Sequence, residues 1–563
     1  MVYAPSKNLW TKINNLYSMK SNRRNFIQSL GLGAASLSVG KQMTSSVAAS
    51  TDDQVLFVGD QIAVAQTEYG KVRGFILRGI NQFLGIPYGA DTSGKNRFMP
   101  PQKPAAWSEI KPCVWWGNTA PQIMEKRYSN AYASFVDHWN YDDVSEDCLR
   151  LNVWTPAIDS SKRPVIVWLH GGGFTNGNAI EQDGYHGENI SRLGNVVFVS
   201  INHRLGPFGY SHLKAAGGHP HSGNVGNLDM VAALEWVKNN IAHFGGDAGN
   251  VTIIGQSGGG AKVTSLMNMP SAKGLFHKAV ALSGSSLGGV NKEYAEKLGV
   301  KVMEEAGLKE GEIEKLQQIP WRQYIDITSR AVEKMNEEAK KMGITRGGFS
   351  PVADGVTMND QPFFSDPNHF SADIPLIINT TFHEFSPSRT DASLELITLA
   401  GVVDKIKPRF ADQSAAIVEA FHQNFPNAKP IEIWAMINSN RKGAIAAADA
   451  KFSQGKAPVY VSWFGWQPPL FDGRMRAFHC DDICFWFYNT DLMLTHTGGG
   501  KRPRALSTKM AKSFLNFVKT GNPNGGGLPN WKPYTKTNGE TMILDDQCSL
   551  VNNPDGQARK ALG

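Results

Sequence analysis

VTIIGQSGGG, residues 251–260, is a run of β-branched residues that leads directly into a glycine-rich turn. The run 251–254 predicts a buried strand, and residues 261–268 predict a helix after the turn. The turn matches the pattern GxSxG in the strand–turn–helix setting that this pattern requires. We therefore expect Ser257 to occupy a strained turn with its hydroxyl exposed, where glycine neighbours avoid crowding. The alternative is a glycine-rich turn without a catalytic role.

A second glycine-rich segment, His170-Gly171-Gly172-Gly173-Phe174, follows a predicted strand at 165–169. Consecutive glycines let backbone N–H groups turn toward one point. The N–H groups of Gly172 and Gly173, together with that of Gly258, are therefore predicted to form an oxyanion hole. A phosphate-binding loop is the rival interpretation. It is excluded because neither GxxxxGK[ST] nor GxGxxG follows.

Several apolar runs end at polar or turn-forming residues. These runs are 165–169, 196–199, 251–254, 279–282 and 376–378. Continuous apolar runs are typical of strands that are buried on both faces of a mainly parallel sheet. Helical patterns lie between them, of which 228–241 is a clear example. The sequence therefore predicts an α/β fold with a central, mostly parallel, twisted sheet flanked by helices.

Three other regions have patterns of their own. Near the start, 62–69 and 72–84 predict two antiparallel strands joined at Gly70. Residues 291–345 and 392–456 are charged and helix-prone, which predicts helical insertions that cover the sheet.

The composition is that of a folded chain. Of 563 residues, 41% are apolar and 19% are charged, which argues against a disordered chain. The 57 glycines are far from the one residue in three of collagen. Length alone suggests three or four domains. Because no internal repeat or long low-complexity linker divides the chain, residues 50–563 are expected to form a single domain.

The net charge of +7 is concentrated at one end of the chain. Residues 1–49 contain six Lys or Arg and no Asp or Glu, so residues 50–563 carry only +1. A charge this close to zero gives no electrostatic reason to expect a nucleic-acid partner. No stretch reaches 18 continuous apolar residues, so no stable membrane span is expected in the mature chain.

The N-terminal segment has the three parts of an export signal. Twin arginines at 23–24 precede a weakly apolar stretch at 30–39, and small residues follow at 47–49. This order predicts a cleaved twin-arginine signal and hence a periplasmic or secreted protein. The alternative is a disordered tail with an incidental arginine pair, and the sequence leaves open whether Met1 or Met19 is the start.

The five cysteines leave at least one without a partner. Cys113 and Cys148 bracket an aromatic-rich loop. A disulfide between them would close a loop of about 36 residues, and two buried free thiols are the alternative. Cys480 and Cys484 would be neighbours on a helix, and their pairing and that of Cys548 are left open. The lack of a CxxC pair argues against a zinc ribbon or a thioredoxin-like site.

Further motifs make the chain similar to a known family. They are FLGIPYG at 83–89, EDCLRLNVWTP at 146–156, NHRLGPFG at 202–209, GNLD at 226–229, FGGD at 244–247, FHKAVALSGS at 276–285 and TGNPN at 520–524. The chain resembles type-B carboxylesterases, the α/β-hydrolases that include cholinesterases, bacterial nitrobenzyl esterases and fungal lipases. The resemblance runs from about residue 67 to about residue 546. It implies an α/β-hydrolase fold with helical insertions over the active site, no metal or organic cofactor, and a Cys113–Cys148 disulfide like the family's first.

The same resemblance assigns two partners to Ser257. Glu384 follows the predicted strand at 376–378, and His479 precedes an acidic helix start. The chain order Ser257, Glu384, His479 is the order expected of this fold. His479 would take the serine proton and return it to the leaving alcohol, and Glu384 would fix the tautomer of the imidazole and stabilise its cation.

Two rivals stand near these residues. Asp354 is another candidate acid, but its Asp-Gly pair suggests a turn and it precedes the strand. His383 adjoins Glu384 and is expected to point away from it. A histidine suits the assigned role because its ordinary pKa of about 6.5 allows both proton transfers near neutral pH.

The sequence is therefore interpreted as a serine carboxylesterase that forms an acyl-enzyme with small to medium apolar or aromatic esters. Gln256 stands where many family members have Glu, which argues weakly against choline esters. Gly258 stands where many have Ala, which keeps the N–H donor but loosens the turn. Trp115, Trp116 and Trp139 either line a pocket or pack their loop onto the core. A lipase, an amide-cleaving hydrolase and a catalytically silent adhesion or binding homologue are the alternatives, and the natural ester and the oligomeric state are left open.

Overall fold

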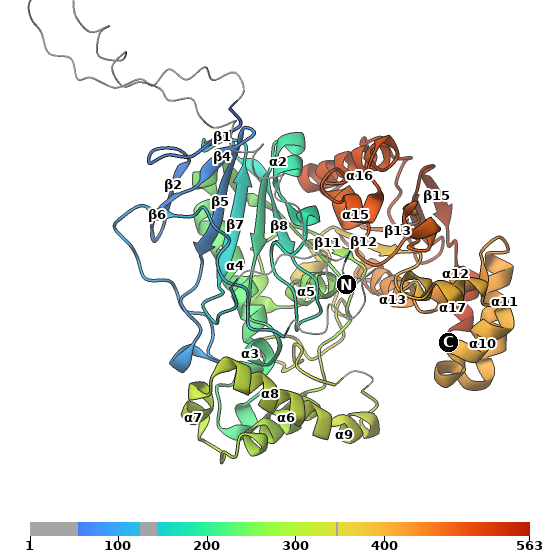
Figure 1. Ribbon diagram of the computed structural model, residues 1–563, viewed down its shortest axis with the longest axis horizontal. Coiled ribbons are helices and arrows are strands. Elements are labelled where there is room, and N and C mark those ends of the chain that lie inside the picture. Colours follow the sequence, from blue (N-terminus) through green and yellow to red (C-terminus); the bar gives the residue numbers. More distant parts are fainter. Residues whose placement is uncertain (1–53, 124–134, 136–142, 345–346) are drawn as a thin grey trace, which may run out of the picture. The chain divides into compact units, whose positions relative to one another are not determined.

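The predicted strand at 251–254 forms the second half of β10 (Gly246–Gln256), which lies near the middle of a twelve-stranded sheet (Figure 1). The computed structural model describes residues 54–123, 135, 143–344 and 347–563. The predicted export signal and Trp139 lie outside these residues. Val55–Gly563 form one compact unit.

The sheet is parallel at its centre and antiparallel at both edges. Its strand order is β1-β4-β5-β7-β9-β8-β10-β11-β12-β13-β14-β15. The other strands are β1 (Leu56–Phe57), β4 (Phe75–Leu77), β5 (Ile80–Pro87), β7 (Arg150–Thr155), β8 (Arg163–Leu169), β9 (Val197–Ile201), β11 (Lys278–Leu282), β12 (Leu376–Thr381), β13 (Val459–Phe464), β14 (Glu540–Leu544) and β15 (Ser549–Asn552). All pairings from β9 across to β14 are parallel. The predicted mostly parallel sheet is therefore confirmed.

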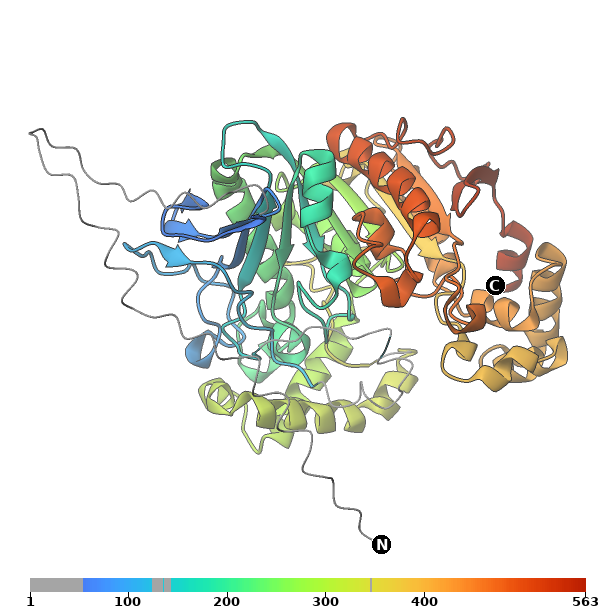
Figure 2. The same cartoon turned by 45° about the horizontal axis from the view of Figure 1, so that its top comes forward.

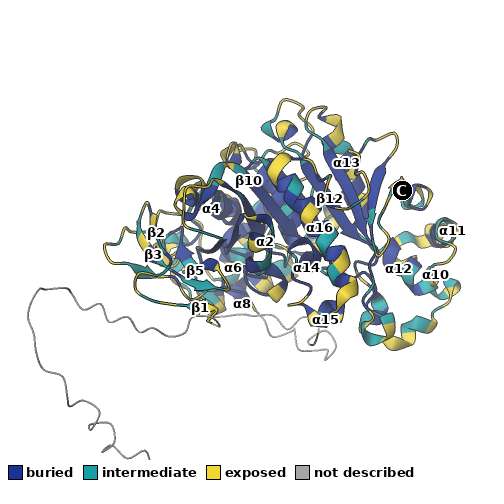
Figure 3. Ribbon diagram, turned by 90° about the horizontal axis from the view of Figure 1, so that it is seen from above, coloured by how far each residue is buried: buried dark blue, intermediate teal, exposed yellow. Residues whose placement is uncertain are grey.

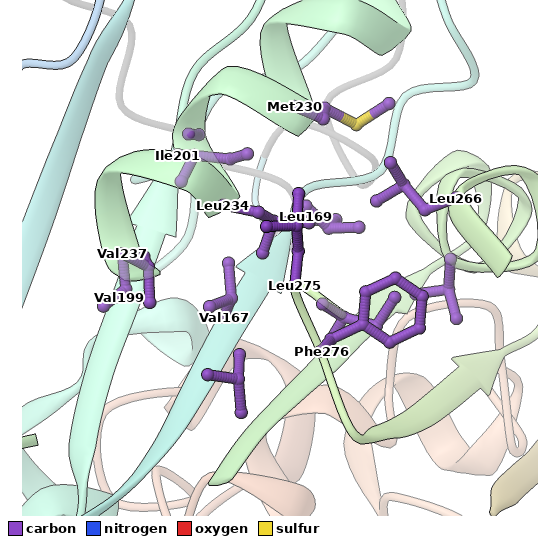
Figure 4. Packing of buried hydrophobic residues seen from close by; sticks show 14 of the residues in the cluster. Val167, Leu169, Val199, Ile201, Met230, Leu234, Val237, Leu266, Leu275 and Phe276 are labelled. Carbon is purple, nitrogen blue, oxygen red and sulfur yellow. The ribbon is translucent and has the colours of Figure 1, made fainter. Parts of the chain in front are cut away.

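Side chains along each central strand point alternately to two layers of helices. One layer contains α4 (Val225–Asn240) and α5 (Gly258–Met267), and the other contains α2 (Glu188–Gly194), α14 (Ile483–Trp486) and α16 (Lys501–Thr520). Val167 and Leu169 of β8 pack against Leu234 and Leu266 in the first layer (Figure 4), whereas Trp168 belongs to the core of the second layer. Burying each such side chain contributes roughly 1.5–3 kcal/mol, so two covered faces account for the continuous apolar runs.

The helical insertions form two groups outside these layers (Figures 1 and 2). The first group is α6 (Lys292–Glu305), α7 (Ile313–Gln318), α8 (Trp321–Lys334) and α9 (Asn336–Lys341). The second is α10 (Leu399–Phe410), α11 (Ser414–Asn424), α12 (Pro430–Ile437) and α17 (Gly556–Ala561). Each group has its own apolar cluster, and exposed residues of the second group lie on α10 and α11 (Figure 3). α13 (Arg441–Ser453) of the second insertion packs along the sheet against β12 and β13, and the apolar cluster of the second group includes Trp463 of β13.

The short helices and a small second sheet lie in the connections. The helices are α3 (Gly206–Tyr210) and α15 (Leu494–Thr497), and the small sheet contains β2 (Val64–Thr67), β3 (Gly70–Arg73) and β6 (Lys111–Pro112). Within the described ranges, no helix has both the length and the apolar character needed to cross a membrane.

The predicted hairpin near the start is correct in its first half only. β2 and β3 pair around Gly70 as expected, but the predicted strand 72–84 is divided among β3, β4 and β5. Arg78 and Gly79 both have positive φ, 47° and 79°, and they form a tight turn between β4 and β5. Positive φ at two central residues is the geometry that two-residue hairpins prefer, and the usual Asn-Gly signal for it is missing here.

The expected Cys113–Cys148 disulfide is not formed in the structure, where both residues are buried free thiols. The carbonyl of Cys113 accepts a hydrogen bond from Leu84, whereas Cys148 lies next to Leu149, whose carbonyl accepts one from Tyr88. The two cysteines therefore lie in backbone segments that bond to different residues of the β5 region.

The other cysteines lie in separate surroundings. Cys480 lies in a turn with φ 75°, and Cys484 lies on α14, so the two are not neighbours on one helix as the spacing suggested. Cys548 is also a free thiol.

Candidate active site

Ser257 lies between β10 and α5 in a strained backbone conformation, with φ 58° and ψ −123°. Such a conformation costs roughly 1–3 kcal/mol for a residue that has a side chain. It is held by two backbone hydrogen bonds, from the N–H of Ser257 to the carbonyl of Leu282 (2.8 Å) and from the N–H of Ala261 to the carbonyl of Ser257 (3.2 Å). Gly284 passes so close that a Cβ there would lie 1.7 Å from the Ser257 carbonyl oxygen. Ser257 itself is partly exposed.

Glu384 and His479 are paired directly. Glu384 follows β12, His479 precedes α14, and Nδ1 of His479 is hydrogen-bonded to Oε2 of Glu384. The N–H of Thr381 donates to the other carboxylate oxygen (2.9 Å), and the N–H of His479 donates to the Glu384 carbonyl (2.9 Å). Glu384 is buried, whereas the side chain of His479 is 16% exposed. The carboxylate therefore orients the imidazole and leaves Nε2 on its more accessible side.

Gln256 connects His479 to the turn that carries Ser257. Its amide nitrogen lies 3.3 Å from Nε2 of His479, and its amide oxygen accepts a hydrogen bond from Sγ of Cys480 (3.2 Å). Among the described residues, Oγ of Ser257 makes no hydrogen bond to His479. Hydrogen bonds between catalytic groups are commonly loose in the free enzyme and tighten when substrate binds.

The three glycines predicted for the oxyanion hole meet beside Ser257. Gly172 and Gly173 have positive φ, 80° and 64°, and their N–H groups donate to no other residue in the described part of the chain. Gly258 begins α5, where N–H groups have no partner within the helix. A Cβ on Gly258 would lie 2.2 Å from the carbonyl oxygen of Gly173, so the two segments touch through their backbones.

A hydrogen bond from the segment around Gly206 holds the loop that carries Gly172 in place. The carbonyl of Phe174 accepts a hydrogen bond from the N–H of Gly206 (2.7 Å). The segment around Gly206 is anchored by the buried pair Arg204–Asp229, in which Nε and Nη2 of the arginine donate to the carboxylate over 2.8 Å and 2.6 Å. These contacts connect the segments 202–209 and 226–229 to the glycine loop.

Comparison with known proteins identifies the family that has this architecture. Residues 61–560 match the model of the carboxylesterase family. The chain belongs to this family. The predicted family, fold class and enzyme class are therefore confirmed.

Individual carboxylesterases are similar over nearly their whole length. Para-nitrobenzyl esterase of Bacillus subtilis (strain 168) is 32% identical over 508 residues, which are 89% of this chain and 98% of that protein. A carboxylesterase of Geobacillus stearothermophilus has a TM-score of 0.73 and 31% identity, over 89% of this chain and 100% of that one. An esterase of Clostridium hathewayi, described as hydrolysing aliphatic aromatic polyesters, has a TM-score of 0.75 and 31% identity, over 90% and 99%.

The two rival residues of this carboxylesterase have other surroundings. The carboxylate of Asp354 accepts hydrogen bonds from three successive N–H groups at 356–358 and from the amide of Asn224, so it closes a turn. His383 is buried, and burial together with the positive charge of Arg476 lowers its pKa to about 3. An imidazole with a pKa of about 3 is not protonated near neutral pH, so it is unsuited to proton transfer there.

Trp115 and Trp116, which the structure describes, have different surroundings. Trp116 packs on the core, with ring centroids 6.2 Å from Trp154 and 6.5 Å from His186. Trp115 is 51% exposed.

A buried carboxyl group behind the Glu384–His479 pair was missed by the sequence analysis. Asp482 is fully buried, and one of its oxygens accepts hydrogen bonds from the amide of Asn379 (2.8 Å) and from Nε1 of Trp486 (3.1 Å). Burial, followed by the negative charge of Glu384, raises the pKa of Asp482 to about 6. The acidic pair after His479 in AFHCDD is the available signal, but by itself it indicates only a helix start.

We predict that Asp482→Asn stabilises this carboxylesterase in a pH-dependent way. Because the pKa of Asp482 is raised from 3.8 to about 6 on folding, the folded state binds the proton more tightly. The free energy of unfolding therefore falls as pH rises from about 4 to about 6, by roughly 3 kcal/mol. The asparagine oxygen can still accept both hydrogen bonds. The variant should gain stability over the wild type at about pH 7.5, and the difference should vanish near pH 4.

Urea unfolding at the two pH values measures this difference. Asp404→Asn, at an exposed position on α10, is the matched control and should show no pH-dependent change. A loss of stability at about pH 7.5, or an equal change at both pH values, would contradict the prediction.

Proposed function

We propose that this carboxylesterase cleaves carboxylic esters with Ser257 as the nucleophile, His479 as the general base and acid, and Glu384 as the residue that orients the imidazole. The observation that carries the proposal is the paired Glu384 and His479 beside the strained turn of Ser257. The carboxylate accepts a hydrogen bond from Nδ1–H, so Nε2 of His479 carries the lone pair, which faces the Gln256 amide in this structure and can take the serine proton.

The reaction proceeds in two balanced stages. Oγ of Ser257 attacks the ester carbonyl carbon while Nε2 of His479 takes its proton. The tetrahedral intermediate then collapses, the alcohol leaves with the proton from His479, and an acyl-enzyme remains. A water molecule repeats the sequence, giving its proton to His479, and the carboxylic acid is released as Ser257 regains its hydrogen.

The negative oxygen of each tetrahedral intermediate requires donors. The N–H groups of Gly172, Gly173 and Gly258 supply them, because the first two have no other partner among the described residues and the third stands at the start of α5. The positive end of the helix dipole also favours an anion there.

An aromatic surface beside the imidazole favours small to medium apolar or aromatic esters. The ring of Phe385 lies 5.0 Å from that of His479 between centroids, and 49% of Phe385 is exposed. The names of relatives point the same way, since one is a para-nitrobenzyl esterase and another is described as acting on aliphatic aromatic polyesters.

Replacing the nucleophile should abolish turnover. Ser257→Ala is expected to lower kcat for p-nitrophenyl butyrate by about a million-fold, as removal of the serine does in other serine hydrolases. It should also prevent labelling by a fluorophosphonate probe. Ser453→Ala, at an exposed position on α13, is the control and should keep full activity. Retention of most activity in Ser257→Ala would overturn the assignment, and a wild type that neither turns over esters nor is labelled would indicate a silent homologue.

A comparison of substrates tests the proposed ester class. The value of kcat/KM should be at least about tenfold higher for short- and medium-chain aryl esters than for an emulsified long-chain triglyceride or an anilide of the same acyl group. Faster cleavage of the emulsion would identify a lipase, and faster cleavage of the anilide would identify an amide-cleaving hydrolase.

We also propose that the protein is exported through its N-terminal segment. The twin arginines at 23–24, the apolar stretch and the small residues support this destination. Replacing both arginines with lysine should keep the precursor in the cytoplasm, whereas Lys12→Arg should not. Fractionation and N-terminal sequencing of the exported protein measure the outcome, and a periplasmic product that retains residues 1–49 would refute the proposal.

A further inference from the structure

Lys262 is a buried cation that the proposed reaction does not use. It lies on α5, five residues after Ser257, and its side chain is 0% exposed. Its ammonium group donates hydrogen bonds to the carbonyl oxygens of His170 (2.8 Å) and, at a longer distance, Gly171 (3.5 Å). Both carbonyls belong to the loop that continues into Gly172 and Gly173.

The surroundings of Lys262 do not favour a positive charge. Burial lowers the pKa of Lys262 to about 7, and only the carboxylate of Glu181 opposes that shift. The nearby imidazoles of His170 and His203 are stacked 5.1 Å apart, and burial and the ammonium hold their pKa values far below 6.5. Nδ1 of His170 also lies 2.9 Å from the carbonyl oxygen of Gly171, and the centroid of the Phe174 ring lies 5.9 Å from the ammonium nitrogen.

A buried charge of this kind is costly, and an apolar side chain of the same length would avoid the cost. The two carbonyl contacts indicate the role of the ammonium group. In a trans peptide the carbonyl oxygen and the N–H point in opposite directions within one plane. The oxygen of Gly171 and the N–H of Gly172 belong to the same peptide, so a donor that holds the oxygen also sets the direction of the N–H.

We propose that Lys262 is a positioning residue for ester cleavage: its ammonium holds the carbonyl of His170 and, together with Nδ1 of His170, that of Gly171, and thereby orients the N–H of Gly172 toward the oxyanion that forms at Ser257. The inference rests on the proposed roles of Ser257 and the oxyanion glycines. Lys262 does not touch the substrate. It acts through the loop, and its charge strengthens the hydrogen bonds that keep the loop in place.

The position of Lys262 predicts a pH signature that a packing role would lack. The ammonium fraction decreases as pH rises through about 7, and a neutral amine is a weaker donor. The ratio of kcat between the wild type and a variant without the amine should therefore be largest near pH 6 and should narrow toward pH 9. The titratable groups that face the ammonium are Glu181, His170 and His203; burial, the largest cause of the low pKa values of the two imidazoles, acts in both enzymes and keeps them neutral over this pH range.

The test compares two buried lysines in the full-length enzyme. Lys262→Met removes the donor and keeps an apolar side chain of similar length. It should lower kcat for p-nitrophenyl butyrate by about 10- to 100-fold near pH 6, with KM changed less than about twofold. Lys451→Met is the matched control, because Lys451 on α13 is also buried and donates to two successive carbonyls, those of Ser371 (2.7 Å) and Ala372 (3.0 Å). It should leave kcat and its pH dependence unchanged.

Inhibition by an aryl trifluoromethyl ketone gives a second measurement, because its adduct with serine carries an oxyanion. The inhibition constant should rise in Lys262→Met by about the same factor as kcat falls. Circular dichroism and thermal unfolding establish whether each variant is folded. If Lys262→Met is unfolded, Lys262→Gln replaces it in the test; because glutamine keeps an uncharged donor, its kcat should lie below that of the wild type.

The outcomes separate this inference from the proposed function. Unchanged kcat in folded Lys262→Met, or a loss that is equal at every pH, overturns the inference while loss of activity in Ser257→Ala leaves the proposed function intact. Activity that survives in Ser257→Ala overturns the proposed function and the inference together.

Discussion

The backbones at the nucleophile turn approach one another so closely that no side chain fits between them. A Cβ on Gly258 would lie 2.2 Å from the Gly173 carbonyl oxygen, one on Gly259 would lie 2.1 Å from that of Leu169, and one on Gly284 would lie 1.7 Å from that of Ser257. This contact brings the start of α5, the end of β8 and the end of β11 together through main-chain atoms alone. It compensates for the strained conformation of Ser257, because the surrounding backbones leave that residue no other arrangement.

The parallel sheet determines which residues reach this point. The carboxyl ends of parallel strands lie at one edge, and loops at that edge commonly form the site. β8 leads into the glycine loop, β10 leads into Ser257 and β12 leads into Glu384. Each of these residues follows the end of its strand by only a few positions, so three parts of the chain that are far apart in the sequence meet at one edge of the sheet. His479 comes from the loop after β13, which is parallel to β12 and next to it.

The sequence predicted the parts of this site to different degrees. The central strands and the turn of Ser257 followed from local patterns, because buried parallel strands are continuously apolar and the turn needs glycine. Glu384 and His479 followed from the family resemblance, since a single carboxylate or imidazole has no local pattern that marks its role. Lys262 and Asp482 were missed for a related reason: both look like ordinary polar residues of a helix or its start, and only their burial distinguishes them.

The expected disulfide shows the same limit of the sequence. Cys113 and Cys148 have a spacing that suits a disulfide, but both are buried free thiols in the structure. The sequence by itself determined the order of strands and helices, the glycine-rich turns and the family, because these depend on residues that are close along the chain. The tertiary structure alone decided which charges are buried, which thiols stay free and which carbonyls Lys262 holds, because these depend on distances between segments that the chain order does not specify.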